Sequence, residues 1–159
     1  MFEPDSLNPW LDDPRLRAAV TTAGTVTSTN VILKKSVQNG GPLPQILIAD
    51  QQTAGVGRHG KHFASPADAG LYISYAFHPQ INRALITPAA GVALQQAIAD
   101  QFGISTQIKW VNDLQKAGKK VAGILAEALL EQNAVNLGTG VHILTPDNQP
   151  FENTKHLPN

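Results

Sequence analysis

The sequence predicts an α+β layered domain, and three observations support this fold class. Segments 46–49 and 71–77 have the length and the apolar, β-branched and aromatic content of strands. A well-delimited helix pattern covers 87–102. Two more apolar segments, 121–130 and 134–143, are separated by a short polar turn. Several strands mixed with two or three helices pack as layers around one core.

The first third of the chain is expected to hold two helices and a strand. Residues 6–20 read as a short helical lead-in, whose apolar side comprises Trp10, Leu11, Leu16, Ala19 and Val20. A second helix over 31–37 can be capped by Ser28, Thr29 and Asn30 and ended by Asn39, Gly40 and Gly41. The strand at 45–49 leads into a glycine-rich loop, and the strand at 71–77 leaves it.

The second half begins with the clearest helix of the chain. Thr87 can cap it, Pro88 takes the first helical position and Gly103 ends it. Its apolar spacing comes from Val92, Leu94, Ala97, Ile98 and Phe102.

A strand at 107–110 and a turn at 116–119 follow. Segment 121–130 fits a strand or a helix by pattern alone. We prefer a strand, because Gln132 and Asn133 would then join it to 134–143 as a hairpin. The tail, 145–159, has three prolines and little apolar content and is expected to be loose.

Composition narrows the class of protein. A chain of 159 residues with 42% hydrophobic and 15% charged residues has the size and content of one globular domain. Twelve basic side chains balance twelve acidic ones, so no overall field attracts nucleic acid or a membrane. The chain has no cysteine, no signal-peptide pattern and no apolar stretch near the roughly 18 residues that span a bilayer. We therefore expect a soluble, cytoplasmic protein.

The glycine-rich loop is the most informative segment. Positions 55–61 hold three glycines together with Arg58, His59 and Lys61, and no acid. Glycine lets backbone N–H groups turn toward a ligand, and the basic side chains supply positive charge. This combination suits a phosphate or another compact anion, although a mobile connection without a ligand is the alternative.

Two nucleotide-binding patterns also match this loop. Gly55, Gly60 and Lys61 fit G-x-x-x-x-G-K, but His62 stands where a P-loop needs a Ser or Thr hydroxyl. Gly55, Gly57 and Gly60 fit G-x-G-x-x-G. Both patterns require a helix directly afterwards, whereas here a loop leads into a strand. Neither interpretation is therefore favoured.

Other polar residues have structural as well as functional interpretations. Ser28, Thr29 and Asn30 can serve only as a helix cap or can also bind a polar head group. Lys109 at the end of a strand can place its ammonium in a cleft. Asp50 and Glu127 are isolated carboxylates without an obvious pair. The histidines lack metal-ligand spacing, so no metal site is predicted from protein ligands.

Taken in order, these clusters resemble the biotin protein ligases. The matching blocks begin with Ser28-Thr29-Asn30 and Gln52-Thr53-Ala54-Gly55-Val56-Gly57-Arg58-His59-Gly60-Lys61-His62-Phe63, followed by Ser65-Pro66 and Leu71-Tyr72-Ile73-Ser74. They continue with Lys109-Trp110-Val111-Asn112-Asp113, Gly123-Ile124-Leu125-Ala126-Glu127 and Gly138-Thr139-Gly140-Val141. The likeness runs from about residue 25 to 145, and blocks in the right order are far more specific than any one alone.

The resemblance implies a fold and a reaction. The fold is a mixed, largely antiparallel sheet with helices packed on one side, similar to class II synthetases. In the reaction, the biotin carboxylate attacks the α-phosphate of magnesium-bound ATP, giving biotinyl-5′-adenylate and pyrophosphate. A lysine amine on a biotin carboxyl carrier protein domain then attacks this mixed anhydride and releases AMP. ATP with Mg²⁺ and biotin are thus the implied substrates.

The resemblance also assigns residues. Those that match the biotin pocket are Ser28, Thr29, Asn30, Gln52, Gly57, Arg58, Lys109 and Gly123. Those that match the ATP or adenylate site are Gly55, Val56, Gly57, Arg58, Gly60, Lys61, Phe63, Lys109 and Asn112. Lys109 matches the lysine that contacts the biotin carboxylate and the α-phosphate, and Phe63 stands where Trp usually packs on adenine. Lys109 and Arg58 are the expected catalytic residues, because two cations offset the repulsion between a carboxylate and a polyphosphate.

The chain departs from the family pattern at several positions. The family loop usually reads Gly-Arg-Gly-Arg-x-Gly-Arg, and here Val56 replaces the first Arg and Lys61 the last. Lysine cannot make the bidentate contact of arginine, so weaker binding of the adenylate is expected. Val111 replaces the usual Pro, and His142 stands where Asn is commoner.

The resemblance suggests a division of the chain as well. We expect an N-terminal lead-in at 1–24, a catalytic domain at 25–145 and a loose tail at 146–159, without the C-terminal β-barrel or the N-terminal helix-turn-helix region of some relatives. A shortened ligase-like protein that binds biotin or an acyl adenylate without efficient transfer is one alternative. A lipoate or octanoyl ligase is another. A homodimer through a sheet edge is possible, whereas nucleic-acid and membrane partners are not expected.

Overall fold

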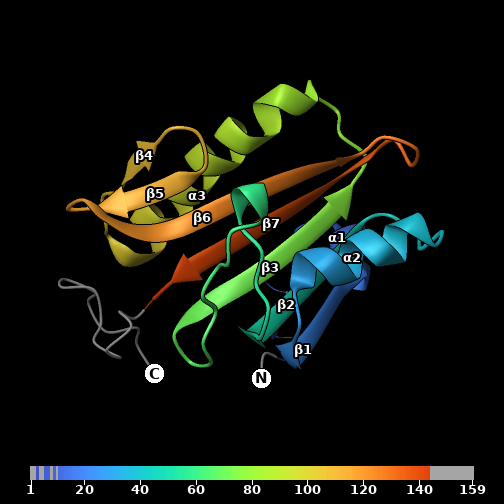
Figure 1. Ribbon diagram of the computed structural model, residues 1–159, viewed down its shortest axis with the longest axis horizontal. Helices are drawn as coiled ribbons and strands as arrows, with labels where there is room; N and C mark the ends of the chain where they lie inside the picture. Colours follow the sequence, from blue (N-terminus) through green and yellow to red (C-terminus); the bar gives the residue numbers. More distant parts are fainter. Residues whose placement is uncertain (1–2, 4–5, 8, 10, 144–159) are drawn as a thin grey trace.

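A single mixed sheet organises the chain (Figure 1). The computed structural model describes residues 3, 6, 7, 9 and 11–143. The described strands are β1 Val20–Val26, β2 Gln45–Gln52, β3 Gly70–Phe77, β4 Gln107–Lys109, β5 Asp113–Lys116, β6 Lys119–Leu129 and β7 Ala134–His142. The described helices are α1 Pro14–Ala19, α2 Thr29–Gln38 and α3 Ile86–Phe102, with the short 3-10 turns η2 Arg58–Gly60 and η3 Arg83–Leu85.

The strand order is β1-β2-β3-β7-β6-β5-β4, and only β1 and β2 are parallel. Helix α2 connects this parallel pair, as expected because parallel neighbours need a crossover connection. The β5–β6 hairpin turns at Ala117 and Gly118, whose φ values of 48° and 76° suit a type I′ turn. The predicted α+β class with a mixed, largely antiparallel sheet is confirmed.

Two apolar clusters lie on opposite faces of the sheet. Leu33 and Val37 of α2 pack with Leu129 of β6, whereas Ile98 of α3 packs with Ile124 of the same strand. Side chains five positions apart on a strand point to opposite faces. Figure 1 shows α2 in front of the sheet and α3 behind it. The expectation that the helices pack on one side is therefore wrong, because the central strands bury both faces.

The structure also corrects the N-terminal prediction. The helical lead-in expected over 6–20 is a helix only at Pro14–Ala19, and Val20 begins the edge strand β1. The sequence of β1, VTTAGTV, is rich in β-branched residues that favour strands. Trp10 and the tail 145–159 lie outside the described residues.

Most other element predictions are confirmed, with two changes. Segment 121–130 is a strand, and Gly103 ends α3 with a left-handed φ of 65°. Helix α3 begins at Ile86, so Thr87 is not its cap and Pro88 takes the third helical position, not the first. Asn82 caps the preceding turn η3 by accepting from the N–H of Ala84. Strand β5, which directly precedes the predicted turn, was not predicted. It has only four residues and three of them are polar, so it lacks the apolar pattern that is typical of a strand.

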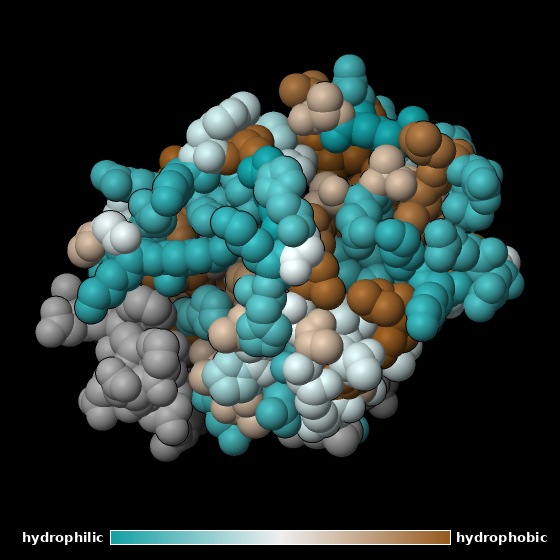
Figure 2. All heavy atoms as spheres, viewed as in Figure 1, coloured by the Kyte–Doolittle hydropathy of each residue, from teal (hydrophilic) through white to brown (hydrophobic). Residues whose placement is uncertain are grey.

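The glycine-rich loop folds back on itself in front of the sheet (Figure 1), on a face of the molecule that hydrophilic residues largely cover (Figure 2). Gly57 N–H donates to the Lys61 carbonyl at 2.7 Å, and Phe63 N–H donates to the Gly55 carbonyl at 2.8 Å. A Cβ on Gly55 would lie 2.4 Å from the Phe63 carbonyl oxygen, so only glycine permits this approach. No α-helix follows the loop before β3, which excludes the P-loop and dinucleotide-binding interpretations. In the described part of the chain, none of the helices is long and apolar enough to cross a membrane.

Candidate active site

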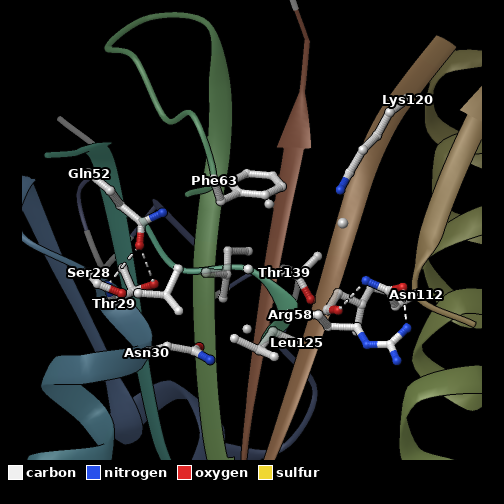
Figure 3. Close-up of a pocket in the computed structure, with 17 residues that line it drawn as sticks. Ser28, Thr29, Asn30, Gln52, Arg58, Phe63, Asn112, Lys120, Leu125 and Thr139 are labelled. Atoms are coloured by element: carbon white, nitrogen blue, oxygen red, sulfur yellow. Dashed lines mark hydrogen bonds between the residues drawn. The ribbon is translucent and has the colours of Figure 1, made fainter. Parts of the chain in front are cut away.

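A cleft opens on the sheet face that α2 covers, between the start of α2, the glycine-rich loop and strands β6 and β7 (Figure 3). About 430 Å³ of space lies within and just above this cleft, counting the part that is open to solvent. Its lining residues are Ser28, Thr29, Asn30, Gln52, Val56, Gly57, Arg58, Phe63, Ile73, Asn112, Lys120, Gly123, Ile124, Leu125, Gly138, Thr139 and Gly140.

One end of the cleft is polar and uncharged. Thr29 donates to Gln52 Oε1 through its backbone N–H at 2.9 Å and through its hydroxyl at 3.0 Å. Gln52 Nε2 donates in turn to Ser65 Oγ at 2.8 Å. Ser74 Oγ, which is fully buried, lies 2.8 Å from Thr29 Oγ1. These hydrogen bonds fix the donors and acceptors at this polar end of the cleft, and such a fixed, uncharged arrangement suits a neutral polar group of a ligand.

The floor of the cleft consists of two glycines on paired strands. Gly123 of β6 lies opposite Gly140 of β7, and the Phe63 ring packs on both. A Cβ on Gly140 would lie 2.3 Å from Phe63 Cε1, and one on Gly123 would lie 2.8 Å from Phe63 Cε2. The absence of side chains here lets a flat ring rest directly on the backbone.

A lysine stands at the other end of the cleft. Lys120 Nζ lies 2.8 Å from Asp113 Oδ1 and 5.2 Å from the centre of the Phe63 ring. The Asp113 carboxylate from β5 therefore holds the ammonium beside the aromatic ring.

A β-bulge explains why Lys120 faces the cleft. Asp113 pairs with Gly123 and Leu114 with Ala122, but Gln115 pairs with Lys120, so Val121 is the extra residue. If side chains alternated strictly along β6, Lys120, three positions before Gly123, would point to the face opposite that of Gly123. The bulge reverses this and brings Lys120 onto the cleft side.

Arg58 supplies a second cation from the glycine-rich loop. Its Nη1 donates to Asn112 Oδ1 at 3.0 Å, and Figure 3 shows both side chains together at one end of the cleft. Asn112 is anchored on β6, because the Ile124 N–H donates to the Asn112 carbonyl at 2.8 Å and Asn112 Nδ2 donates to the Ile124 carbonyl at 3.3 Å. The loop arginine is thus tied to the sheet.

His142 lies at the rim beside these groups. Its ring stacks on Phe63 with centroids 5.0 Å apart and an interplanar angle of 28°. Burial lowers the pKa of His142, and the nearby positive charge of Lys120 lowers it further. The imidazole is therefore favoured in its neutral form next to the lysine.

Most of the residues predicted for the two sites line this one cleft. They are Ser28, Thr29, Asn30, Gln52, Val56, Gly57, Arg58, Phe63, Asn112 and Gly123. Four predicted residues, Gly55, Gly60, Lys61 and Lys109, do not line it. Gly55 is buried in the loop packing, and Gly60 and Lys61 are exposed.

Of these four residues, Lys109 matters most, because the resemblance assigned it a catalytic role. It is exposed at the end of the edge strand β4, where it pairs with Asp113, and it lies two strands away from Gly123. Lys120, which the sequence reasoning missed, occupies the cleft instead. Its neighbour Gly123 was recognised, but the bulge that turns the lysine inward has no signal in the sequence pattern.

Comparison with known proteins gives a family for this fold and cleft. The sequence model described as "Biotin/lipoate A/B protein ligase family" matches residues 23–143. The chain belongs to the biotin/lipoate A/B protein ligase family. The resemblance to biotin protein ligases is thereby confirmed.

Individual relatives agree with this family. The chain is 34% identical over 124 residues to the bifunctional ligase/repressor BirA of Bacillus subtilis, covering 74% of this chain and 38% of the relative. It is also 34% identical over 161 residues to the biotin–[acetyl-CoA-carboxylase] ligase of Mycobacterium tuberculosis, covering 90% and 60%. The chain thus spans less than two thirds of the length of these relatives.

Solved structures support the same fold. A biotin protein ligase from Aquifex aeolicus in complex with biotin and ATP superimposes with a TM-score of 0.70 at 26% identity, covering 83% of this chain and 58% of that one. A biotin protein ligase from Leishmania major in complex with biotin also gives a TM-score of 0.70, at 21% identity, covering 80% and 57%. The seven-stranded sheet is therefore the fold of this family.

Proposed function

We propose that this chain binds biotin and ATP and joins them as biotinyl-5′-adenylate. The observation that carries the proposal is the polarity of the cleft, which is neutral and hydrogen-bonding at Thr29 and Gln52 and cationic at Lys120 and Arg58. Biotin has the same polarity, with an uncharged cyclic urea at one end and a carboxylate at the other. Its carboxylate would meet the α-phosphate between the two cations.

In this proposal, Lys120 takes the role that the sequence resemblance gave to Lys109. The developing negative charge on the α-phosphate needs a fixed cation, and Lys120 is held in the cleft by Asp113 whereas Lys109 is exposed outside it. Arg58, tied to Asn112, is the second cation. Because Arg58 comes from the glycine-rich loop, movement of that loop would also shield the reactive anhydride from water.

The nucleotide would lie beside Phe63. The ring rests on Gly123 and Gly140 and is flanked by Lys120 and His142, so a base could stack near it while its phosphates reach the cations. ATP would enter as its magnesium complex. Val56 in place of an arginine leaves this loop with one cation fewer.

The second half of the proposed reaction is transfer to a carrier-domain lysine. Its neutral amine would attack the carbonyl carbon of the mixed anhydride, forming an amide and releasing AMP with loss of a proton. In the alternative, a ligase-like protein that binds biotin or an acyl adenylate, this transfer step is inefficient. The homodimer through a sheet edge, which the resemblance leaves possible, can be tested by sedimentation.

The first test is incubation of the purified chain with biotin and magnesium ATP. Pyrophosphate release and retained biotinyl-adenylate, identified by mass spectrometry, would support the proposal, and labelling of a biotin carboxyl carrier protein domain would then test transfer. Biotin that raises the melting temperature without forming adenylate would favour the binding-only alternative. Preference for lipoate in a competition assay would point to a lipoate or octanoyl ligase. The absence of both binding and adenylate would contradict the proposal.

A further inference from the structure

Glu127 lies just outside the cleft and contacts a residue that lines it. On β6, its Oε2 accepts from Asn30 Nδ2 at 3.2 Å, and its Oε1 accepts from Lys34 Nζ at 3.0 Å. Lys34 is one helical turn after Asn30 on α2, so the carboxylate bridges two side chains on the same face of that helix. Glu127 itself is not among the residues that line the cleft.

The Asn30 side chain is confined on its other sides. Asn30 is 4% exposed, and its Oδ1 accepts from the buried Ser74 hydroxyl. The Asn30 carbonyl accepts from Asn136 Nδ2 at 2.8 Å, which fixes the backbone. A Cβ on Gly138 would lie 2.7 Å from Asn30 Cγ, so the amide is packed directly against the β7 backbone. Little room remains for the side chain except to rotate its amide.

The charge of Glu127 decides that rotation. A carboxylate accepts hydrogen bonds and donates none, so the Asn30 NH₂ group faces Glu127 and the carbonyl oxygen faces Ser74. A rotated amide would place its oxygen against the carboxylate and leave two acceptors facing each other. The favoured orientation uses one Nδ2 hydrogen for Glu127 and leaves the second for a ligand.

The orientation also affects the neighbouring hydroxyls. The Ser74 hydroxyl has one hydrogen, which it gives either to Asn30 Oδ1 or to Thr29 Oγ1. If the Asn30 amide rotated, its NH₂ group would donate to Ser74, and Ser74 would then have to donate to Thr29. The donors and acceptors offered by the polar end of the cleft thus depend on the Asn30 amide.

We propose that Glu127 is a positioning residue that sets the donor and acceptor pattern at the polar end of the cleft. It holds the Asn30 amide so that an N–H faces the ligand, which favours a head group with an acceptor there, such as the carbonyl oxygen of a cyclic urea. Lys34 orients the carboxylate from the solvent side. The orientation of Asn30 follows from the contacts alone, whereas the identity of the head group rests on the proposed function.

Binding by Glu127→Leu, Glu127→Gln and Lys34→Met variants tests this role, with Glu131→Gln, an exposed carboxylate in the same hairpin, as the control. By calorimetry we expect Glu127→Leu to weaken biotin binding at least about tenfold, the size of one lost charge-assisted hydrogen bond. Glu127→Gln, which keeps an acceptor for Asn30, should recover most of this loss, and Lys34→Met should have a smaller effect. The KM for ATP should change little in all of these variants, and the melting temperature of the ligand-free Glu127→Gln chain should stay close to that of the parent, because glutamine keeps an acceptor for Asn30.

Discrimination is a second readout. The dithiolane of lipoate has no urea, so the ratio of biotin to lipoate affinity should fall in Glu127→Leu and stay unchanged in Glu131→Gln. Biotin affinity within about twofold of the parent in Glu127→Leu would overturn the proposal, since one such bond is worth more than this. Equal losses of biotin and ATP affinity together with a lower melting temperature would also overturn it, because they indicate a merely structural role.

The orientation of Asn30 can be measured without a ligand. In the parent chain, the two side-chain N–H resonances of Asn30 should be well separated and slow to exchange, and Glu127→Leu should shift them and speed their exchange. If the parent does not bind biotin but these resonances respond, the proposed function fails and the positioning role stands. If the resonances do not respond, the positioning role is wrong whatever the chain binds.

Discussion

Replacement of Lys120 by alanine is the most direct test of how the cleft works. A unit charge about 4 Å from the α-phosphate would contribute roughly 4 kcal/mol at an effective dielectric constant of 20. The Lys120 side chain is 39% exposed and its ammonium lies 2.8 Å from Asp113, so solvent and the carboxylate both reduce this contribution. We therefore expect a loss of about 2.7 kcal/mol, or about a hundredfold in adenylation rate, at the low end for one electrostatic donor.

Lys109→Ala is the matched control, because both variants remove one lysine from the same end of the sheet, where β4 and β6 flank β5. Lys109 is exposed outside the cleft, so its removal should change the rate by no more than about threefold, as for most surface substitutions. Single-turnover formation of biotinyl-adenylate, followed with pyrophosphate release, measures both. Melting temperatures would show that each variant is folded.

Either of two results would refute the reasoning. A hundredfold loss in Lys109→Ala with a nearly normal Lys120→Ala would mean that the resemblance assigned the lysine correctly and that the cleft geometry misleads. Nearly normal rates in both variants would mean that neither lysine stabilises the transition state. Partial recovery by Lys120→Arg would support a charge effect rather than a specific ammonium contact.

Three further predictions concern the surroundings of the cleft. Gly140→Ala should displace the Phe63 ring, because the new Cβ would lie 2.3 Å from Phe63 Cε1. The lost aromatic packing is worth roughly 1 kcal/mol, so calorimetry should show ATP binding about fivefold weaker. Unchanged ATP binding would contradict this prediction. The parent should lose stability as the pH falls below about 6.5, because the pKa of His142 is lowered in the folded state and the unfolded chain therefore binds the proton first. Thermal melts at pH about 7.5 and about 5.5 should show a smaller loss of stability for His142→Asn. Identical pH profiles of parent and variant would argue against this role of His142. Tyr72→Phe should cost about 1 kcal/mol in urea unfolding, because it removes the hydrogen bond to the Pro66 carbonyl. Burial raises the pKa of Tyr72 to about 12, so the parent should lose stability above pH about 10, and Tyr72→Phe should lose less, with Tyr75, whose pKa burial also raises, supplying the remainder. Identical alkaline profiles of parent and variant would count against the second part.

Local features were predictable where the reason for them is local. Gly103 ends α3 because a left-handed residue closes a helix most easily as glycine, and Ala117 and Gly118 lie within the predicted turn. The order of the glycine-rich loop, the Asn112 block and Gly123 was enough to place them in one site. Strand β1 was missed because a segment of seven residues beside a helical pattern gave no strong periodic signal.

Contacts between distant segments could not be predicted in the same way. Asn30 and Glu127 are 97 residues apart, and Glu127 looked isolated until β6 placed it beside the start of α2. His142 meets Phe63 because β7 and the glycine-rich loop approach each other over the glycine floor. Such contacts depend on which strands are neighbours, and residue types along the chain do not specify this.

By itself, then, the sequence determined the α+β class, the family resemblance and most of the residues that line the cleft, because these follow from residue types and their order. Only the tertiary structure decided which lysine enters the cleft and how the Asn30 amide is held. The physical reason is register: one extra residue at Val121 turns Lys120 toward the ligand side, and the pairing of Glu127 with Asn136 of β7 places its carboxylate against the start of α2.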